Sequence, residues 1–68
     1  MRKGLRLKFA RIERGLSQKE LAKLSGVPYR TLQTWESEGT HAAAAGRLKR
    51  VADALGRSVD ELIDSEEE

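Results

Sequence analysis

The apolar positions of the chain follow helical spacing along most of its length. Residues 5–16 carry an apolar stripe at i, i+4, i+7 and i+11, which predicts a first helix over residues 1–14 with the stripe facing the core. The stripe consists of Leu5, Phe9, Ile12 and Leu16. Leu7 and Ala10 form a second apolar row, so we expect this helix to be contacted on two sides. No segment alternates apolar and polar residues as a strand would.

A capping pattern predicts where the second helix begins. Glu20 stands three residues after Ser17, so the hydroxyl and the carboxylate can each bond the backbone N–H of the other residue. Leu16 and Leu21 can close over this cap as a hydrophobic staple. Gly26 can adopt the left-handed conformation that ends a helix, so we expect the second helix to end there.

The third helix is expected over about residues 28–37, because Pro28 suits a first helical position. At ~100° per residue, Leu32 and Trp35 fall on one side. The opposite side is polar and consists of Arg30, Gln33, Thr34 and Ser37. A solvated face of an amphipathic helix explains any one of these residues. Two helices joined by a glycine-containing turn are also typical of a helix-turn-helix, whose second helix enters the major groove of DNA.

The C-terminal third predicts two further helices. An apolar row at i, i+3, i+4 and i+7 indicates a helix over about residues 43–55, and a second capping box, Ser58 with Glu61, indicates a short one through Ile63. The row consists of Leu48, Val51, Ala52 and Leu55. The fold class is therefore all-α, a compact bundle of about five short helices. We expect one domain over residues 1–63 and an acidic tail over residues 64–68.

The charge distribution is uneven. Residues 1–50 hold twelve Lys and Arg against four Asp and Glu, whereas residues 51–68 hold one against seven. A basic body suits a polyanionic partner, although a solvated surface of mixed sign explains charge alone equally well. The chain has no cysteine, which excludes disulfides and thiolate metal sites. We expect no membrane span and no signal peptide, because no apolar run is long enough and the N-terminal segment is charged throughout.

Three segments carry a family resemblance, namely GLSQKELAKLSGV (15–27), TLQTWE (31–36) and VADALGRSVDELI (51–63). As a set they resemble the Cro and lambda-repressor-like (Xre-type) helix-turn-helix family, over about residues 7–63. The resemblance implies a sequence-specific binder of double-stranded DNA, acting as a transcriptional regulator of repressor type. It also implies a cytoplasmic, nucleoid-associated protein of bacterial or phage type, and a homodimer on paired half-sites.

Site residues follow from the helical wheel and from the resemblance. Base reading is expected from Arg30, Gln33 and Thr34 on the polar side and from Tyr29 on its flank, with Arg suited to guanine and Gln to adenine. Phosphate contacts are expected from Ser17, Gln18, Lys19, Thr31, Thr40 and His41. For Ser17 the contact would come from its backbone, and for His41 an uninvolved loop histidine is the simpler interpretation. The resemblance further implies an internal ion pair between Arg11 and Glu36. Alanines replace the basic loop residues frequent in the family, so a loop contact to the minor groove or to a dimer partner is not expected.

Two other interpretations remain at this point. The polar helix could meet a protein, as in an antitoxin-like or co-activator module. The run AAAAGRLKRVADAL is compositionally plain, so a natural regulator and an engineered DNA-binding module both stay open. An enzyme is not expected, because the sequence offers no nucleophile–base set, paired carboxylates or metal cluster. We expect no cofactor, no metal and no small-molecule ligand.

Overall fold

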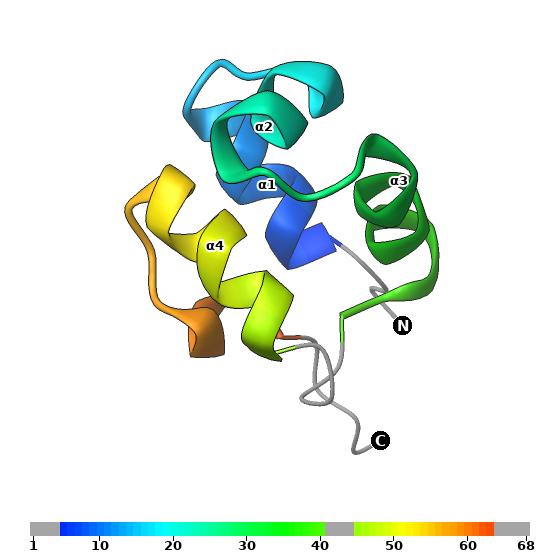
Figure 1. Cartoon of the computed structure of the whole chain (residues 1–68). Helices are drawn as coiled ribbons and strands as arrows, with labels where there is room; N and C mark the ends of the chain where they lie inside the picture. The colour runs from blue at the N-terminus through cyan, green and yellow to red at the C-terminus, as the bar shows by residue number, and fades with distance from the viewer. Residues whose placement is uncertain (1–4, 41–44, 64–68) are drawn as a thin grey trace.

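Helices contain most of the residues that the structure, a computed structural model, describes, namely residues 5–40 and 45–63 (Figure 1). In chain order they are α1 (Leu5–Glu13), α2 (Gln18–Ser25), α3 (Tyr29–Glu38), α4 (Ala45–Leu55) and the 3₁₀ helix η2 (Val59–Glu61). Within the described ranges there is no strand, which confirms the all-α fold. The expected fifth helix is a single 3₁₀ turn. The expected helical start at residues 1–4 and the acidic tail at residues 64–68 lie outside the described residues.

Both ends of α2 are fixed by local hydrogen bonds. The Glu20 N–H donates to Ser17 Oγ over 3.0 Å, and the Ser17 N–H donates to Glu20 Oε1 over 2.8 Å. At the other end Gly26 has φ +76°, and its N–H donates to the Ala22 carbonyl over 2.9 Å. The sequence therefore defines this helix by short-range signals alone.

Helix α3 begins one residue later than expected. Pro28 is extended, with φ −57° and ψ 139°, and precedes the helix instead of occupying its first turn. Its carbonyl accepts from the N–H groups of Thr31 (3.0 Å) and Leu32 (3.2 Å). Proline suits this place equally well, because no hydrogen bond is required of its nitrogen.

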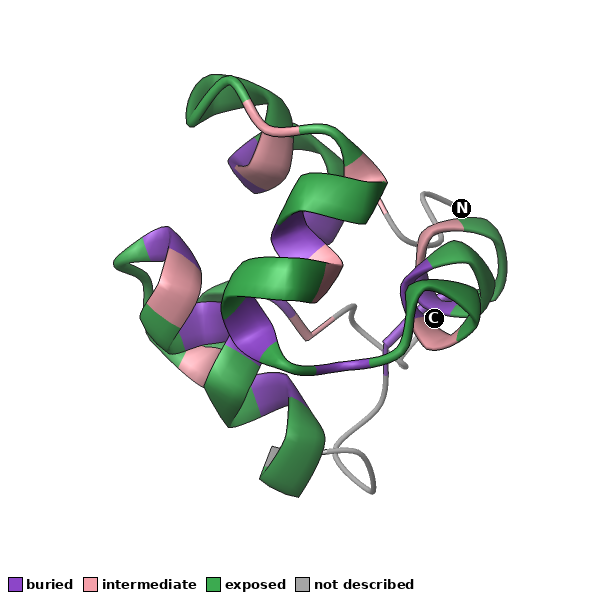
Figure 2. Ribbon diagram, turned by 45° about the horizontal axis from the view of Figure 1, so that its top comes forward, coloured by how far each residue is buried: buried purple, intermediate pink, exposed green. Residues whose placement is uncertain are grey.

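One apolar cluster draws residues from all four α-helices, from the turn after α2 and from Leu62, which follows η2 (Figure 2). Its buried members are Leu7, Ala10, Leu21, Val27, Leu32, Trp35, Leu48, Val51, Ala52, Leu55 and Leu62. The α4 row expected from the sequence is entirely buried here. Burying these side chains is the main favourable contribution to folding in a domain this small.

Of the stripe expected to face the core, only Leu16, which follows the end of α1, packs against it. Phe9 is 56% exposed and Ile12 is 51% exposed, whereas Leu7 and Ala10 are buried. The prediction chose the wrong one of two apolar rows. Arg11 lies close to the Leu7 row on the helix and reaches inward to another helix, so α1 turns that side to the core and the longer stripe outward.

The chain ends, as far as it is described, in a capped turn held against α1. The Ser58 N–H donates to Glu61 Oε1 over 3.0 Å, and the Leu62 N–H donates to the Val59 carbonyl over 2.9 Å. An ion pair between Arg57 and Glu13 joins the loop before this turn to the end of α1. The turn therefore completes the core by burying Leu62.

Candidate nucleic-acid interface

The turn between α2 and α3 is anchored in the core. Val27 is 2% exposed, and its N–H donates to Ser25 Oγ over 3.2 Å. Gly26 supplies the left-handed residue that reverses the chain. Because the middle of the turn is packed, the two helices that it joins are held at a fixed relative orientation.

The outward side of α3 carries polar side chains that are open to solvent. Leu32 and Trp35 are buried on the inner side. The outward side presents Arg30, Gln33, Thr34 and Ser37, all exposed. The Ser37 hydroxyl donates to the Thr34 carbonyl over 3.2 Å. This side therefore displays one cationic donor, one amide and two hydroxyls along a helix whose opposite face is fixed in the core.

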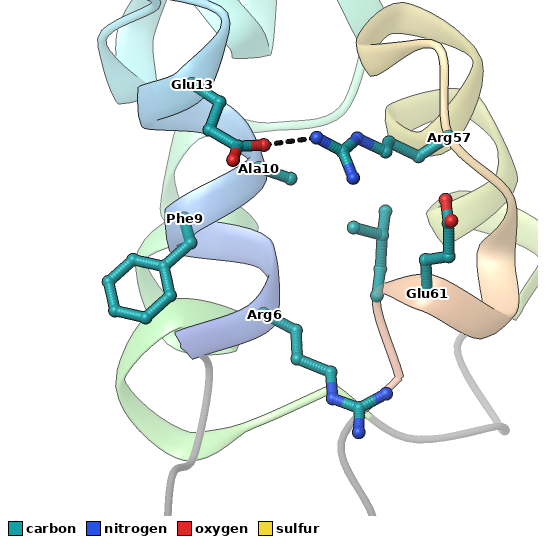
Figure 3. Close-up of a pocket in the computed structure, with 7 residues that line it drawn as sticks. Arg6, Phe9, Ala10, Glu13, Arg57 and Glu61 are labelled. Carbon is teal, nitrogen blue, oxygen red and sulfur yellow. Dashed lines mark hydrogen bonds and ion pairs between the residues drawn. The ribbon is translucent and has the colours of Figure 1, made fainter.

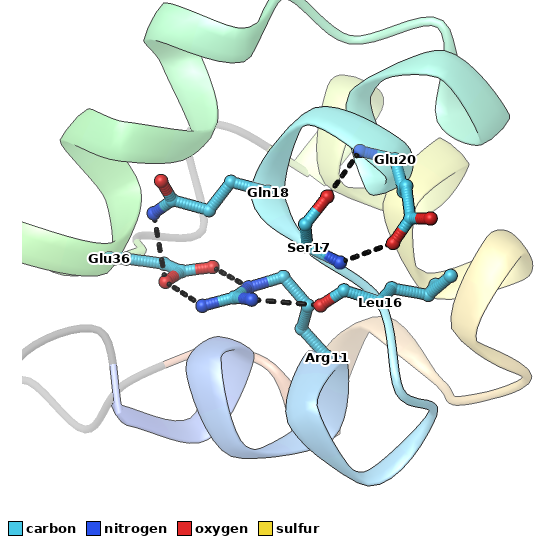
Figure 4. A network of polar contacts seen from close by, with 6 residues as sticks. All are labelled: Arg11, Leu16, Ser17, Gln18, Glu20 and Glu36. Atoms are coloured by element: carbon cyan, nitrogen blue, oxygen red, sulfur yellow. Dashed lines mark hydrogen bonds and ion pairs between the residues drawn. The ribbon is translucent and has the colours of Figure 1, made fainter.

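A polar network joins α3 to α1 and to the start of α2 (Figure 4). The Arg11 guanidinium donates to both oxygens of Glu36, with Nε to Oε2 at 2.7 Å and Nη2 to Oε1 at 2.9 Å. Its remaining nitrogen, Nη1, donates to the Leu16 carbonyl over 2.9 Å. Gln18 Nε2 donates to Glu36 Oε1 over 3.1 Å. One carboxylate therefore links three helices.

The burial of this network makes its geometry rigid. The side chains of Arg11 and Glu36 are only 12% and 6% exposed. The hydrogen bonds that Arg11 donates to Glu36 raise the pKa of Arg11 above its ordinary value; burial opposes this, and the charge of Glu36 adds to the rise. Bidentate arginine–carboxylate pairs are among the strongest hydrogen-bonded pairs in proteins. The pair therefore fixes the position of α3 relative to α1.

The start of α2 presents free backbone donors and a side-chain contact to Tyr29 of α3. By helix geometry the N–H groups of Gln18 and Lys19 have no carbonyl partner within α2, so they point out of its positive end. Lys19 Nζ lies 5.5 Å from the centre of the Tyr29 ring. This contact places a cation and an aromatic side chain together where the two helices begin.

The structure bears on three of the residues that were expected to contact phosphate. The Ser17 N–H already donates to Glu20, so a phosphate contact from Ser17 stays a prediction for its hydroxyl hydrogen. Thr40 is completely buried, and its hydroxyl donates to the Leu62 carbonyl, so its side chain cannot reach a phosphate. His41 lies outside the described residues. Thr31, by contrast, is half-buried on the first turn of α3.

Sequence reasoning missed two members of the polar network. The Leu16 carbonyl and the Gln18 amide both help to hold the Arg11–Glu36 pair. Gln18 and Glu36 are eighteen residues apart, and no local pattern relates them. The available signal was indirect, because a buried carboxylate needs more than one donor.

The arrangement agrees with a comparison against known protein families. A family model described as helix-turn-helix matches residues 7–62, which is most of the chain. The chain belongs to the helix-turn-helix family. The match confirms the resemblance to Xre-type, lambda-repressor-like domains, and the family is one of DNA-binding domains, which act in transcription regulation, and not of enzymes. A search of curated proteins gave no significant match.

In this helix-turn-helix domain, α2 and α3 are the two motif helices. Among the helices described, none is both long and apolar enough to cross a membrane. The described part of the chain also holds no cluster of three or more His, Cys, Asp or Glu residues suited to a metal ion.

Proposed function

We propose that this helix-turn-helix domain reads a specific sequence of double-stranded DNA by placing α3 in the major groove, and that it acts as a transcriptional regulator of repressor type. The observation that carries the proposal is the exposed polar side of α3 on a helix whose inner side is held by the core and by the Arg11–Glu36 pair. A rigid helix can present side chains to base edges in one register. We also propose that the DNA-binding domain covers residues 1–63 and that residues 64–68 form an acidic tail.

Base reading is assigned to the side chains that lead outward from α3. Arg30 suits bidentate pairing with guanine, and Gln33 suits adenine. Thr34 can contact a thymine methyl group or donate from its hydroxyl. Tyr29, held near Lys19, stands at the start of the helix, where it can meet a base or the backbone. Together these four side chains can contact only a few base pairs.

Phosphate binding is assigned to the beginning of α2. The outward N–H groups of Gln18 and Lys19 and the positive end of the helix form a suitable anion site. Lys19 adds a full charge, and Ser17 can donate from its hydroxyl. Thr31 on α3 is assigned a further phosphate contact. Such contacts set the register of the protein on the duplex, whereas α3 sets its sequence preference.

Two copies on paired half-sites follow from the small size of the interface. One domain of this size makes few phosphate contacts and reads few base pairs. Two copies on paired half-sites about one helical turn apart would double the number of base pairs that are read. We therefore expect a selected DNA site to show two-fold symmetry.

The test is selection from a random duplex library, followed by affinity measurements at two salt concentrations. We expect a motif of about four to seven base pairs in each half-site. No enrichment, with weak binding that disappears as salt rises, would show that the basic surface acts only as a polyelectrolyte and would overturn the proposal. In that case a protein partner would be the next candidate.

Arg30→Ala sharpens this test, and Lys49→Ala is its charge-matched control. Lys49 lies on α4 and is exposed, with Asp53 as its ion-pair partner at 3.5 Å. Arg30→Ala should cost about 1–3 kcal/mol on the selected site and relax preference at one base pair. Lys49→Ala should weaken binding to all sequences by the same small factor. Equal losses for Arg30→Ala on every sequence would reduce Arg30 to a phosphate contact.

A further inference from the structure

The outer side of α1 carries large apolar side chains that no part of the described chain covers. Phe9 is 56% exposed and Ile12 is 51% exposed. Leu5, half-buried, lies in line with them one turn earlier. In Figure 3 the Phe9 ring points outward from α1, away from Arg57 and Glu61. Apolar side chains gathered on one face of a small domain mark an interaction surface more often than isolated ones do.

The charges beside this stripe are of both signs and occupy defined places. At ~100° per residue, Arg6 and Glu13 both lie about 90° from Leu5, on the same flank of α1 and two turns apart. Arg6 forms no ion pair with any residue in the described ranges, whereas Glu13 is paired with Arg57 through one carboxylate oxygen and its side chain stays 63% exposed. The flank therefore presents a cation at one end and an exposed carboxylate at the other.

A groove next to this flank is also lined by charged residues of both signs. It lies between α1 and η2 and has a volume of about 350 Å³ (Figure 3). Its charged lining residues are Arg6, Glu13, Arg57 and Glu61, two of each sign. A surface without net charge offers little to a nucleic acid, whose binding depends on excess positive charge. A second copy of this chain brings the same balanced charges, so it suits this surface better than a polyanion does.

Two-fold symmetry supplies the matching geometry. A dyad perpendicular to α1 lays two copies of the helix antiparallel and sets each flank against the same flank of the other copy. If the dyad passes midway between Phe9 and Ile12, Phe9 of one copy meets Ile12 of the other. Arg6 then lies within about 3 Å, measured along the helix axis, of the level of the other copy's Glu13, since each residue rises ~1.5 Å. The symmetry forms this pair twice.

We propose that the outer face of α1 is a self-association surface on which a second copy of this chain docks antiparallel. Leu5, Phe9 and Ile12 form its apolar strip, and Arg6 and Glu13 its reciprocal charges. Because the strip comes from one short helix, the association is weak, with a dissociation constant in the micromolar to millimolar range. The proposal concerns the protein free of DNA and does not rest on the proposed base reading.

Sedimentation equilibrium of the free protein, from about 10 μM to about 1 mM, measures this association. Phe9→Ser should raise the dissociation constant by at least about tenfold, since it removes both central contacts. The matched control is Leu24→Ser at the end of α2, where Leu24 is 63% exposed and outside the strip. It should leave the constant unchanged. A monomer at every concentration, or equal effects of both variants, would overturn the proposal.

A charge exchange tests the predicted register. Arg6→Glu alone and Glu13→Arg alone each create like-charge contacts at both pairs, so each should weaken self-association about tenfold. Mixing the two variants restores both opposite-charge pairs in a heterodimer, and the double variant restores them in a homodimer. A folding defect cannot produce rescue on mixing.

Lys8→Glu provides the control for this exchange. Lys8 lies on the other flank of the strip, so mixing its variant with Glu13→Arg should give no rescue. Absence of rescue between Arg6→Glu and Glu13→Arg would refute the antiparallel arrangement. The base preference of the Phe9→Ser variant on a single half-site reports separately on the proposed function, so failure of one proposal is distinguishable from failure of the other.

Discussion

The carboxylate of Glu36 is the most informative single group to perturb. Glu36→Gln keeps the size and shape of the side chain but removes its charge. In the structure this carboxylate accepts two hydrogen bonds from Arg11 and one from Gln18. After the substitution one oxygen remains as an acceptor, and an NH₂ group must face a guanidinium N–H.

The expected loss of stability follows from burial and hydrogen bonding. Removing one partner of a fully buried pair costs about 3–5 kcal/mol, because the other charge is left without compensation. Arg11 keeps its bond to the Leu16 carbonyl, and the glutamine keeps one acceptor. Both effects reduce the penalty, so we expect about 2 kcal/mol, and in any case more than about 1 kcal/mol. A domain of this size has only about 3–10 kcal/mol in total.

Thermal and urea denaturation followed by circular dichroism measure this loss. For a domain of this length, 2 kcal/mol lowers the Tm by about 8–16 °C. Glu20→Gln is the matched control, since it removes the same charge from the exposed capping box of α2. Glutamine also serves in a capping box, so this control should cost less than about 0.5 kcal/mol. If Glu36→Gln falls within that margin of the control, the pair does not stabilise the fold and the reasoning fails.

The dependence on pH is a second test of the same pair. Glu36 raises the pKa of Arg11 in the folded state. A raised folded-state pKa contributes stability that is complete below the unfolded value and is lost as pH rises through the folded value. Both values lie above the range in which the protein can be studied. The difference in stability between the wild-type protein and Glu36→Gln should therefore be constant from neutral to moderately alkaline pH.

Two further predictions concern glycine and threonine positions. Gly26→Ala should lower the free energy of unfolding by about 1 kcal/mol, because Gly26 has φ +76°. Gly46→Ala inside α4 should raise it by about 0.5–1 kcal/mol, because an added Cβ there meets nothing within 4 Å. Urea denaturation measures both changes, and equal effects of the two substitutions would contradict the backbone argument. Thr40→Val should cost about 1–2 kcal/mol, since it leaves the buried Leu62 carbonyl without this donor, while Thr34→Val on the exposed side of α3 should change the free energy of unfolding by less than about 0.5 kcal/mol.

Short-range signals allowed much of this protein to be predicted from its sequence. The capping box of Ser17 with Glu20 and the left-handed Gly26 define α2, because each rests on residues no more than four positions apart. The inner and outer sides of α3 follow from helical periodicity in the same way. The family resemblance supplied the Arg11–Glu36 pair, which is present in the structure but which spacing alone could not have identified.

Only the tertiary structure decided which side of α1 is buried. Two apolar rows competed, and their periodicity was equally helical. Leu7 is inside because Arg11, on nearly the same side of α1, pairs with Glu36, which lies twenty-five residues further along the chain in α3. Phe9 and Ile12 remain outside for that reason.

Thr40 shows the same limit for a polar residue. Its sequence neighbours indicate a solvated turn, yet its hydroxyl is buried against the Leu62 carbonyl, twenty-two residues further along the chain. The sequence by itself determined the helices, their caps and the polar side of α3, since those depend on local backbone geometry. The core-facing side of α1, the burial of Thr40 and the partners of Gln18 depend on which distant groups meet, and only the packed fold brings those groups together.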